Sequence, residues 1–300
     1  MKKYILYQID AFTKRRFKGN PAGVVVNSDG LSDSQMQTIA RELNNSETAF
    51  LFMPDGSDCD GVIRYFTPSV EVPICGHATI AAMYAKTVEE SLDSYTVQMK
   101  TGVGVLPFEI QRQGDEIKVW MTQGPFQISA PLSPEVTEDM LQYLGLYPDD
   151  LTPECPIQIA STGHSKVMIC IKSRETLNRL TPDMTQLAQL SNRIQCNGFF
   201  VFTLDSNVPG TFSFGRMFAP AIGINEDPVT GNANGPLGGY LVHNNLVDTH
   251  VDTFSFHGKQ GEAIGREGTV EVLVEIENHK TKLVKIAGEA VTVFKTSIDL

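Results

Sequence analysis

Hydrophobic positions follow helix and strand periods in a fixed order along the first part of the chain. In residues 32–44 apolar side chains recur with the spacing of one helix face, at Met36, Ile39, Ala40 and Leu43. Ser32 followed by Gln35 matches a capping box, so a helix is predicted to begin there. The apolar run 48–53, a turn rich in glycine and aspartate, and the segment 63–66 then predict two strands.

The second part of the chain repeats this order. Thr181 suits an N-cap and Pro182 the first turn of a helix. Apolar positions follow in that predicted helix, at Met184, Leu187 and Leu190. The run 199–202, a Pro-Gly turn and the segment 212–218 again predict two strands. The chain is therefore predicted to consist of two similar halves.

One motif occurs in both halves. Arg-Tyr-Phe-Thr-Pro at 64–68 is followed by Gly-His-Ala-Thr at 76–79, and Arg-Met-Phe-Ala-Pro at 216–220 is followed by Gly-Asn-Ala-Asn at 231–234. Each copy predicts a strand, a polar loop and the start of a helix rich in small residues. A helix start offers unpaired backbone N–H groups and the positive end of a dipole, which suit a carboxylate. Two such starts facing each other would hold one small acidic molecule.

Strand-rich stretches follow each copy of the motif. They comprise residues 95–99, 103–110 and 117–121 in the first half, and 254–256, 270–276, 283–286 and 290–294 in the second. The helices that begin at His77 and near Pro236 are apolar on most faces, which is typical of buried helices. The predicted class is α+β: two pseudo-symmetric halves, each a curved, mostly antiparallel sheet or barrel around a central apolar helix. The boundary is placed near Gly124, giving halves 1–123 and 124–300, with the last strand free to pack on the N-terminal half.

Composition narrows the functional classes. The 300 residues are 41% hydrophobic and 20% charged, as in ordinary globular proteins of about two domains. A net charge of −11 argues against nucleic acid or an anionic membrane as the main partner. No apolar stretch approaches a membrane helix, and the first residues meet a charge too early for a signal peptide. Five scattered cysteines lack paired metal spacing, so reduced thiols, a cytoplasmic location and no bound metal are expected.

Glu47 is the best candidate for a catalytic group. It opens an apolar strand and shares a side with Ala49 and Leu51, so partial desolvation would raise its pKa toward that of a useful general base. The corresponding region of the second half, Asn197-Gly198, carries neither acid nor thiol. The alternative is a strand-edge glutamate that faces solvent.

Other candidates surround the two helix starts. Asp227 precedes the second start and suits an acid/base or orienting role, or only a turn before proline. His77 lies at the first start, where the dipole favours neutral imidazole as a donor or relay; it could also be a packing residue. Cys75 is a thiol that a helix start makes more acidic, or a small buried residue. Gly76, Gly231 and Asn232 would present donors to a carboxylate.

Several segments resemble the PhzF (phenazine biosynthesis) family over nearly the whole chain. They are Gly-Asn-Pro-Ala-Gly at 19–23, Ser-Glu-Thr-Ala-Phe at 46–50, residues 64–68 through 75–79, Glu-Asp-Pro-Val-Thr-Gly at 226–231, and Gln-Gly at 260–261 with Gly-Arg at 265–266. Within this family, the chain is similar to the YddE-like subgroup of isomerases. The resemblance implies the diaminopimelate epimerase fold, with two pseudo-symmetric halves, an active site between them, no cofactor and a homodimer.

The resemblance also implies roles for matching residues. Glu47 matches the acid/base glutamate that takes a proton from a carbon and returns it elsewhere on the same substrate. His77 and Asp227 match residues that relay protons or hold polar groups of the substrate. Asn232 stands where the phenazine enzyme has a serine, which argues against the phenazine-pathway substrate. Cys75 matches the first of the two epimerase cysteines, whereas the second motif has none.

The predicted function is a cofactor-independent isomerase that moves a proton within a small anionic carboxylate substrate. Two alternatives remain open. An amino-acid or hydroxy-acid epimerase or racemase would exchange a hydrogen and invert one centre. A binding protein of the same fold would have lost the chemistry, although Glu47, His77 and Asp227 are all retained.

Overall fold

The computed structural model describes residues 1–300 as two compact units. Unit 1 comprises Met1–Thr122 and Ala287–Leu300, and unit 2 comprises Gln123–Ile286. The sequence analysis assigned residues 124–300 to the second half and left the last strand free to pack on the first. In the structure residues 287–300 group with unit 1, because the last strand, β17 (Lys280–Asp299), pairs antiparallel with β1 (Lys3–Ala11).

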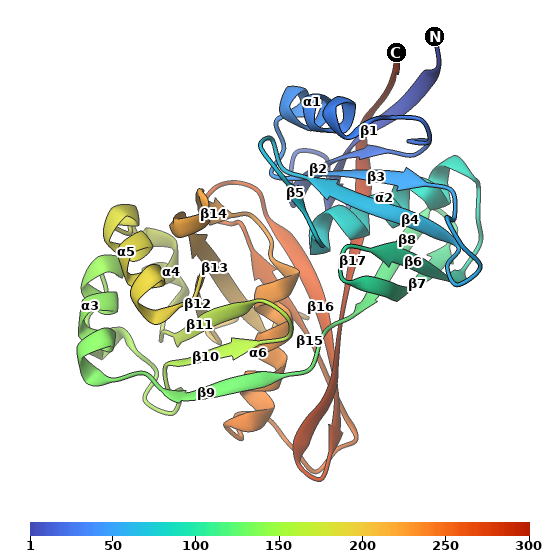
Figure 1. The fold of residues 1–300 in the computed structure, drawn as a ribbon. Helices are drawn as coiled ribbons and strands as arrows, with labels where there is room; N and C mark the ends of the chain where they lie inside the picture. The colour runs from blue at the N-terminus through green and yellow to red at the C-terminus, as the bar shows by residue number, and fades with distance from the viewer. The chain divides into compact units, whose positions relative to one another are not determined.

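Unit 1 is a closed sheet around one helix (Figure 1). After β1 its elements are β2 (Asn20–Val25), α1 (Asp33–Leu43), β3 (Thr48–Phe52), β4 (Gly61–Phe66), β5 (Glu71–Val72), α2 (Gly76–Glu89), β6 (Tyr95–Thr101), β7 (Gly104–Gln113) and β8 (Glu116–Thr122). The order β17-β1-β2-β3-β4-β6-β7-β8 closes on itself, because β8 also pairs with β17. The enclosed helix α2 packs against β1, β2, β3 and β8.

Unit 2 is a second sheet around a second helix. Its elements are β9 (Gln127–Pro131), α3 (Pro134–Leu144), the short 3₁₀ turn η1 (Pro148–Asp150), β10 (Gln158–Ser161), β11 (Ser165–Cys170), α4 (Arg174–Arg179), α5 (Met184–Ile194), β12 (Phe199–Thr203), β13 (Ser213–Ala219), η2 (Pro220–Ile222), β14 (Ile224–Asp227), α6 (Gly231–His243), β15 (Thr253–Gln260) and β16 (Gly268–Glu277). The helix α6, orange in Figure 1, packs against β10, β11 and β16.

Strand pairing shows that the two units are copies of one plan. Pairs β2–β3 and β4–β6 are parallel in unit 1, as are β11–β12 and β13–β15 in unit 2. β9 pairs antiparallel with β10 as β17 does with β1. The predicted duplication and the predicted α+β class are confirmed.

Both central helices are rich in small residues because the sheets approach them closely. Nine residues of α2 are buried, and six of them are alanine or threonine. In α6, a Cβ on Gly238 would lie 2.7 Å from Cγ2 of Val274, and a Cβ on Gly239 would overlap the ring of Phe126. Larger side chains would therefore push the sheet off the helix. No helix of the structure is long and apolar enough to cross a membrane.

Several local predictions need correction. The helix expected to be capped by Thr181 begins at Met184, because the Asp183 side chain accepts the hydrogen bond from the backbone N–H of Gln186 and is the N-cap. The strands expected at 283–286 and 290–294 form one continuous strand, β17.

The register fixes which positions of the two units correspond. Thr48 lies opposite Phe66 in unit 1, and Phe199 lies opposite Phe218 in unit 2. Two positions further along, Arg64 of β4 lies opposite Phe50, and Arg216 of β13 lies opposite Val201. Glu47, which directly precedes β3, therefore corresponds to Gly198, as the alignment of the two halves indicated.

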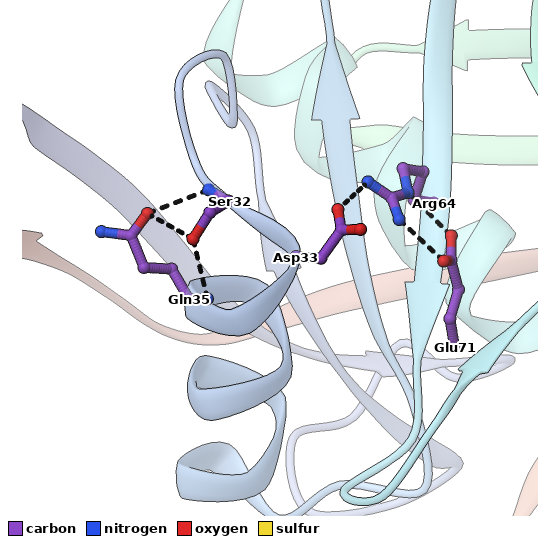
Figure 2. Close-up of polar contacts among 5 residues, drawn as sticks. All are labelled: Ser32, Asp33, Gln35, Arg64 and Glu71. Carbon is purple, nitrogen blue, oxygen red and sulfur yellow. Dashed lines mark hydrogen bonds and ion pairs between the residues drawn. The ribbon is translucent and has the colours of Figure 1, made fainter.

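The duplicated arginines anchor their units differently. Figure 2 shows Arg64 between Asp33 and Glu71, beside the capping box of Ser32 and Gln35 that starts α1. The side chains of Arg64 and Glu71 are 28% and 43% exposed.

Arg216 is more deeply buried than Arg64. It pairs with Glu226 through side chains that are 9% and 11% exposed, and it also donates to the carbonyl oxygens of Leu177 and Leu180. The arginine of unit 2 therefore joins β13, β14 and the end of α4 in the interior.

Removing the acidic partner of each arginine tests this difference. We expect Glu226→Ala to lower the free energy of unfolding by about 3 kcal/mol, because the guanidinium of Arg216 stays buried without its carboxylate. Glu71→Ala leaves Arg64 partly exposed and paired with Asp33, so a loss of about 0.5 kcal/mol is expected. Urea unfolding followed by circular dichroism measures both values. Equal losses would contradict the difference between the buried pair of Arg216 and the partly exposed pair of Arg64.

Candidate active site

Three side chains predicted from the sequence meet at the start of α2. Cys75 is the N-cap residue of this helix and His77 its second residue, while Glu47 directly precedes β3. Oε2 of Glu47 lies 3.4 Å from Nε2 of His77, and Sγ of Cys75 lies 3.4 Å from Nδ1 of the same ring. The imidazole therefore connects a thiol to a carboxylate.

The cluster is shielded from solvent. His77 is 7% exposed and Cys75 8%, and the side chain of Glu47 is 16% exposed. Oγ of Ser46 lies 3.2 Å from Nε2 of His77, beside the Glu47 carboxylate. Hydrogen bonds among such groups are stronger than in water because the local dielectric constant is low. Glu47 is therefore not the solvent-facing strand-edge residue of the alternative prediction.

The same three residues are of types that bind metal ions. One ligand atom from each of Glu47, Cys75 and His77 lies within 4.8 Å of the others. However, the two ring nitrogens of His77 face different partners, Nδ1 toward the thiol and Nε2 toward the carboxylate. A histidine ligand offers one nitrogen to the metal and hydrogen-bonds through the other. The geometry therefore fits a hydrogen-bonded chain better than a ligand set.

A buried tyrosine holds the first turn of α2 in place. The hydroxyl of Tyr65, from β4, lies 2.7 Å from Oγ1 of Thr79, which donates to the carbonyl oxygen of Cys75 at 2.7 Å. Burial raises the pKa of Tyr65 above its usual range, so its hydroxyl stays protonated. Both residues lie within the motifs found in the sequence, but the sequence predicted no positioning role for them and no role for Ser46.

The starts of α2 and α6 differ from those of the other helices. Side chains of the N-cap residues accept hydrogen bonds from backbone N–H groups in α1, α3, α4 and α5, through Ser32, Ser133, Ser173 and Asp183. Neither Cys75 at α2 nor Thr230 at α6 does so. A Cβ added to Gly76 would meet nothing within 4 Å. In both central helices the N-cap side chain therefore leaves the first-turn N–H groups uncapped, and anion binding there stays a prediction.

Unit 2 gathers its predicted residues at the start of α6. The Thr230 hydroxyl donates to Oδ2 of Asp227, the last residue of β14. Oε1 of Gln260 accepts from the Thr230 backbone N–H at 3.0 Å and from Asn234 at 2.7 Å. The Asp227 carboxylate is thus held by the N-cap residue of α6, whose next residues are Gly231 and the half-buried Asn232. That both clusters act on one substrate stays a prediction.

Comparison with known proteins identifies the family. The family described as phenazine biosynthesis-like protein (PhzC-PhzF) matches residues 9–296. An uncharacterized isomerase of Clostridium acetobutylicum is 53% identical over 300 residues, covering 100% of this chain and 99% of that protein. The uncharacterized isomerase YddE of Salmonella typhimurium is 47% identical over 289 residues, 96% of each chain.

Two further proteins extend the comparison. Trans-2,3-dihydro-3-hydroxyanthranilate isomerase of Pseudomonas chlororaphis is 31% identical over 301 residues, 100% of each chain. The crystal structure of a PhzF-family phenazine biosynthesis protein of Bacillus anthracis has a TM-score of 0.88 at 30% identity, with 100% of each chain covered. The resemblance found in the sequence is confirmed, and the chain is an isomerase that belongs to the PhzF family.

Proposed function

We propose that the protein moves a proton within a small carboxylate-bearing substrate, using its own side chains and no cofactor. The observation that carries this proposal is the contact between the Glu47 carboxylate and Nε2 of His77 at the start of α2. A shielded carboxylate beside an imidazole can take up a proton, hold it and return it, which is the chemistry that an isomerisation by proton transfer requires.

His77 supports two states of Glu47. With the proton on Nε2, this nitrogen faces Oγ of Ser46 and the Glu47 carboxylate, while Nδ1 accepts from the Cys75 thiol. Once Glu47 has taken a proton from the substrate, its neutral carboxyl group holds that proton until it returns it to the substrate, and His77 keeps its own proton. His77 thus lies between the thiol of Cys75 and the carboxylate of Glu47 and orients both groups in this proposal.

The first turn of α2 supplies the binding site for the substrate's carboxylate in this proposal. Its backbone N–H groups lack a side-chain cap, and Gly76 leaves the approach to them open. Asp227 and Asn232, in unit 2, are proposed to hold polar groups of the substrate. The relative from Pseudomonas chlororaphis acts on trans-2,3-dihydro-3-hydroxyanthranilate, so we propose an unsaturated or amino-substituted carboxylic acid as the substrate class.

We further propose a homodimer that works in the cytoplasm without nucleic acid or membrane partners. The net charge of −11 disfavours polyanionic partners. All five cysteines are free thiols, which fits a reducing compartment. The homodimer rests on the family resemblance.

Glu47→Gln tests the proposed base. The amide keeps the shape of the side chain but cannot accept a proton, so we expect kcat/KM to fall by about a thousandfold with an unchanged melting temperature. Deuterium uptake from solvent into dihydro-hydroxyanthranilate, diaminopimelate and proline derivatives, followed by NMR, measures the reaction. Glu42→Gln, on the exposed surface of α1, is the matched control.

The position of the label decides between reaction classes. Label at a shifted carbon, lost in Glu47→Gln, supports the isomerase. Label at an unshifted stereocentre would support an epimerase instead. Near-parental exchange in Glu47→Gln would remove Glu47 from the mechanism.

Gly76→Ala and Gly76→Val test the carboxylate site by size. Because an added Cβ meets no protein atom, both variants should fold normally. We expect the dissociation constant of the carboxylate substrate to rise with side-chain size, by about tenfold or more for valine, as the N–H groups become covered. Calorimetric titration and thermal unfolding measure the two effects, and an unchanged affinity in both variants would refute the site.

A further inference from the structure

Unit 2 buries a lysine that the proposed reaction does not yet use. Lys166 is the second residue of β11 and is 7% exposed. Its ammonium donates to the carbonyl oxygen of Ser165 at 3.1 Å. An ammonium carries three donors, and burying a charge with one neutral acceptor costs free energy. Such a residue is more easily explained by a function than by stability.

The duplication relates Lys166 to the catalytic position of unit 1. Val167 pairs with Phe199 as Gly23 pairs with Thr48. One residue earlier in each strand, Lys166 and Gly198 of unit 2 therefore correspond to Ala22 and Glu47 of unit 1.

At these two positions the large and the small side chain are interchanged between the units. The stem of Lys166 occupies the place where a Cβ on Gly198 would stand, with Cε 2.9 Å from it. In unit 1 the small residue is Ala22 and the ionisable one is Glu47. Each unit thus carries one ionisable side chain at this strand pair, an acid in unit 1 and an amine in unit 2.

Contacts between strands link Lys166 to the start of α6. Its stem lies against Gly198, a Cβ on Gly198 would lie 3.5 Å from Sδ of Met217, and Met217 pairs with Asp227.

Burial lowers the pKa of Lys166, whereas negative charge at Cys196 and then at Asp227 opposes that shift. His164, just before β11, has its pKa lowered by burial and by the charge of Lys166. Asp227 is in turn fixed by the hydroxyl of Thr230, the N-cap residue of α6. Lys166 therefore shares one electrostatic environment with the predicted site residues of unit 2.

We propose that Lys166 is the ammonium that binds an anionic group of the ligand beside the start of α6, a carboxylate separate from the one held at the start of α2. The proposal deepens the proposed function, on which it rests for the ligand's class. Two donors of the ammonium remain for the ligand after the bond to Ser165. The uncapped N–H groups at the start of α6 add further donors.

Titration of the protein with simple carboxylates tests this role. The probes are acetate, benzoate and 3-hydroxyanthranilate, with benzamide as the uncharged analogue of benzoate. NMR follows the side-chain nitrogen of Lys166 and the amides of Gly231 and Asn232. We expect carboxylates, but not benzamide, to shift these signals, and Lys166→Met to weaken the binding by about tenfold or more. Lys172→Met, at an exposed lysine of unit 2, is the matched control.

Stability separates a binding role from a structural one. If Lys166 serves the ligand, replacing its buried charge by the apolar side chain of methionine should leave the melting temperature unchanged or raise it. Lys166→Gln is the second variant, and it should weaken carboxylate binding to a similar extent. A lower melting temperature in both variants with unchanged carboxylate binding would overturn the proposal. So would the absence of any carboxylate-dependent shift in the wild type.

Glu47→Gln separates this inference from the proposed function. In that variant deuterium exchange should be lost while the carboxylate shifts at Lys166 persist. If the proposed isomerase function alone were wrong, the carboxylate-dependent shifts at Lys166 would still be observed. Exchange that depends on Glu47, together with a Lys166→Met variant that binds carboxylates like the wild type, would overturn only the role of Lys166.

Discussion

The burial of an apolar helix inside a curved sheet is the constraint on which the rest of each unit depends. A helix enclosed in this way satisfies its own interior backbone groups, but its first-turn N–H groups have no partner within the helix. The four peripheral helices solve this with Ser or Asp side chains, whereas α2 and α6 do not. The ends of the central helices are therefore the places where an anion can stabilise the fold and be bound at the same time.

The surrounding residues hold these helix ends rigidly. In unit 1 the Tyr65–Thr79 contact and the bond from Thr79 to the Cys75 carbonyl fix the first turn of α2. In unit 2 Gln260 bridges Thr230 and Asn234 across the first turn of α6. The unpaired donors are thus preorganised, so a ligand does not have to order them on binding.

Much of this arrangement could be predicted because it lies in local patterns. The repeated motif marked both helix starts, and the order of apolar runs marked the duplication, so Glu47, Cys75 and His77 were placed before their geometry was known. Helix ends were less certain: Thr181 and Asp183 both suit an N-cap, and only the backbone decides which side chain reaches the N–H of Gln186.

Long-range pairing could not be read from the sequence in the same way. The assignment of residues 287–300 to unit 1 depends on the pairing of β17 with β1, between the two ends of the chain. Lys166 was overlooked because a lysine at the edge of an apolar run normally faces solvent. The signal was nevertheless present, since Gly198 stands where the first half has Glu47, and a glycine in a strand often marks close approach of another group.

Divergence between the two copies explains how a duplicated fold can serve an asymmetric reaction. Proton transfer needs one group whose charge changes, and binding needs groups whose charge does not. Unit 1 places a carboxylate, an imidazole and a thiol in contact, a set that exchanges protons readily. Unit 2 has neither thiol nor imidazole in the first turn of α6 and instead offers the amide of Asn232 and the carboxylate that Thr230 holds. Under the further inference, Lys166 adds an ammonium. Under the proposed function, a single catalytic set in unit 1 favours moving a proton between two carbons over inverting one carbon, because inversion requires a second proton-exchanging set.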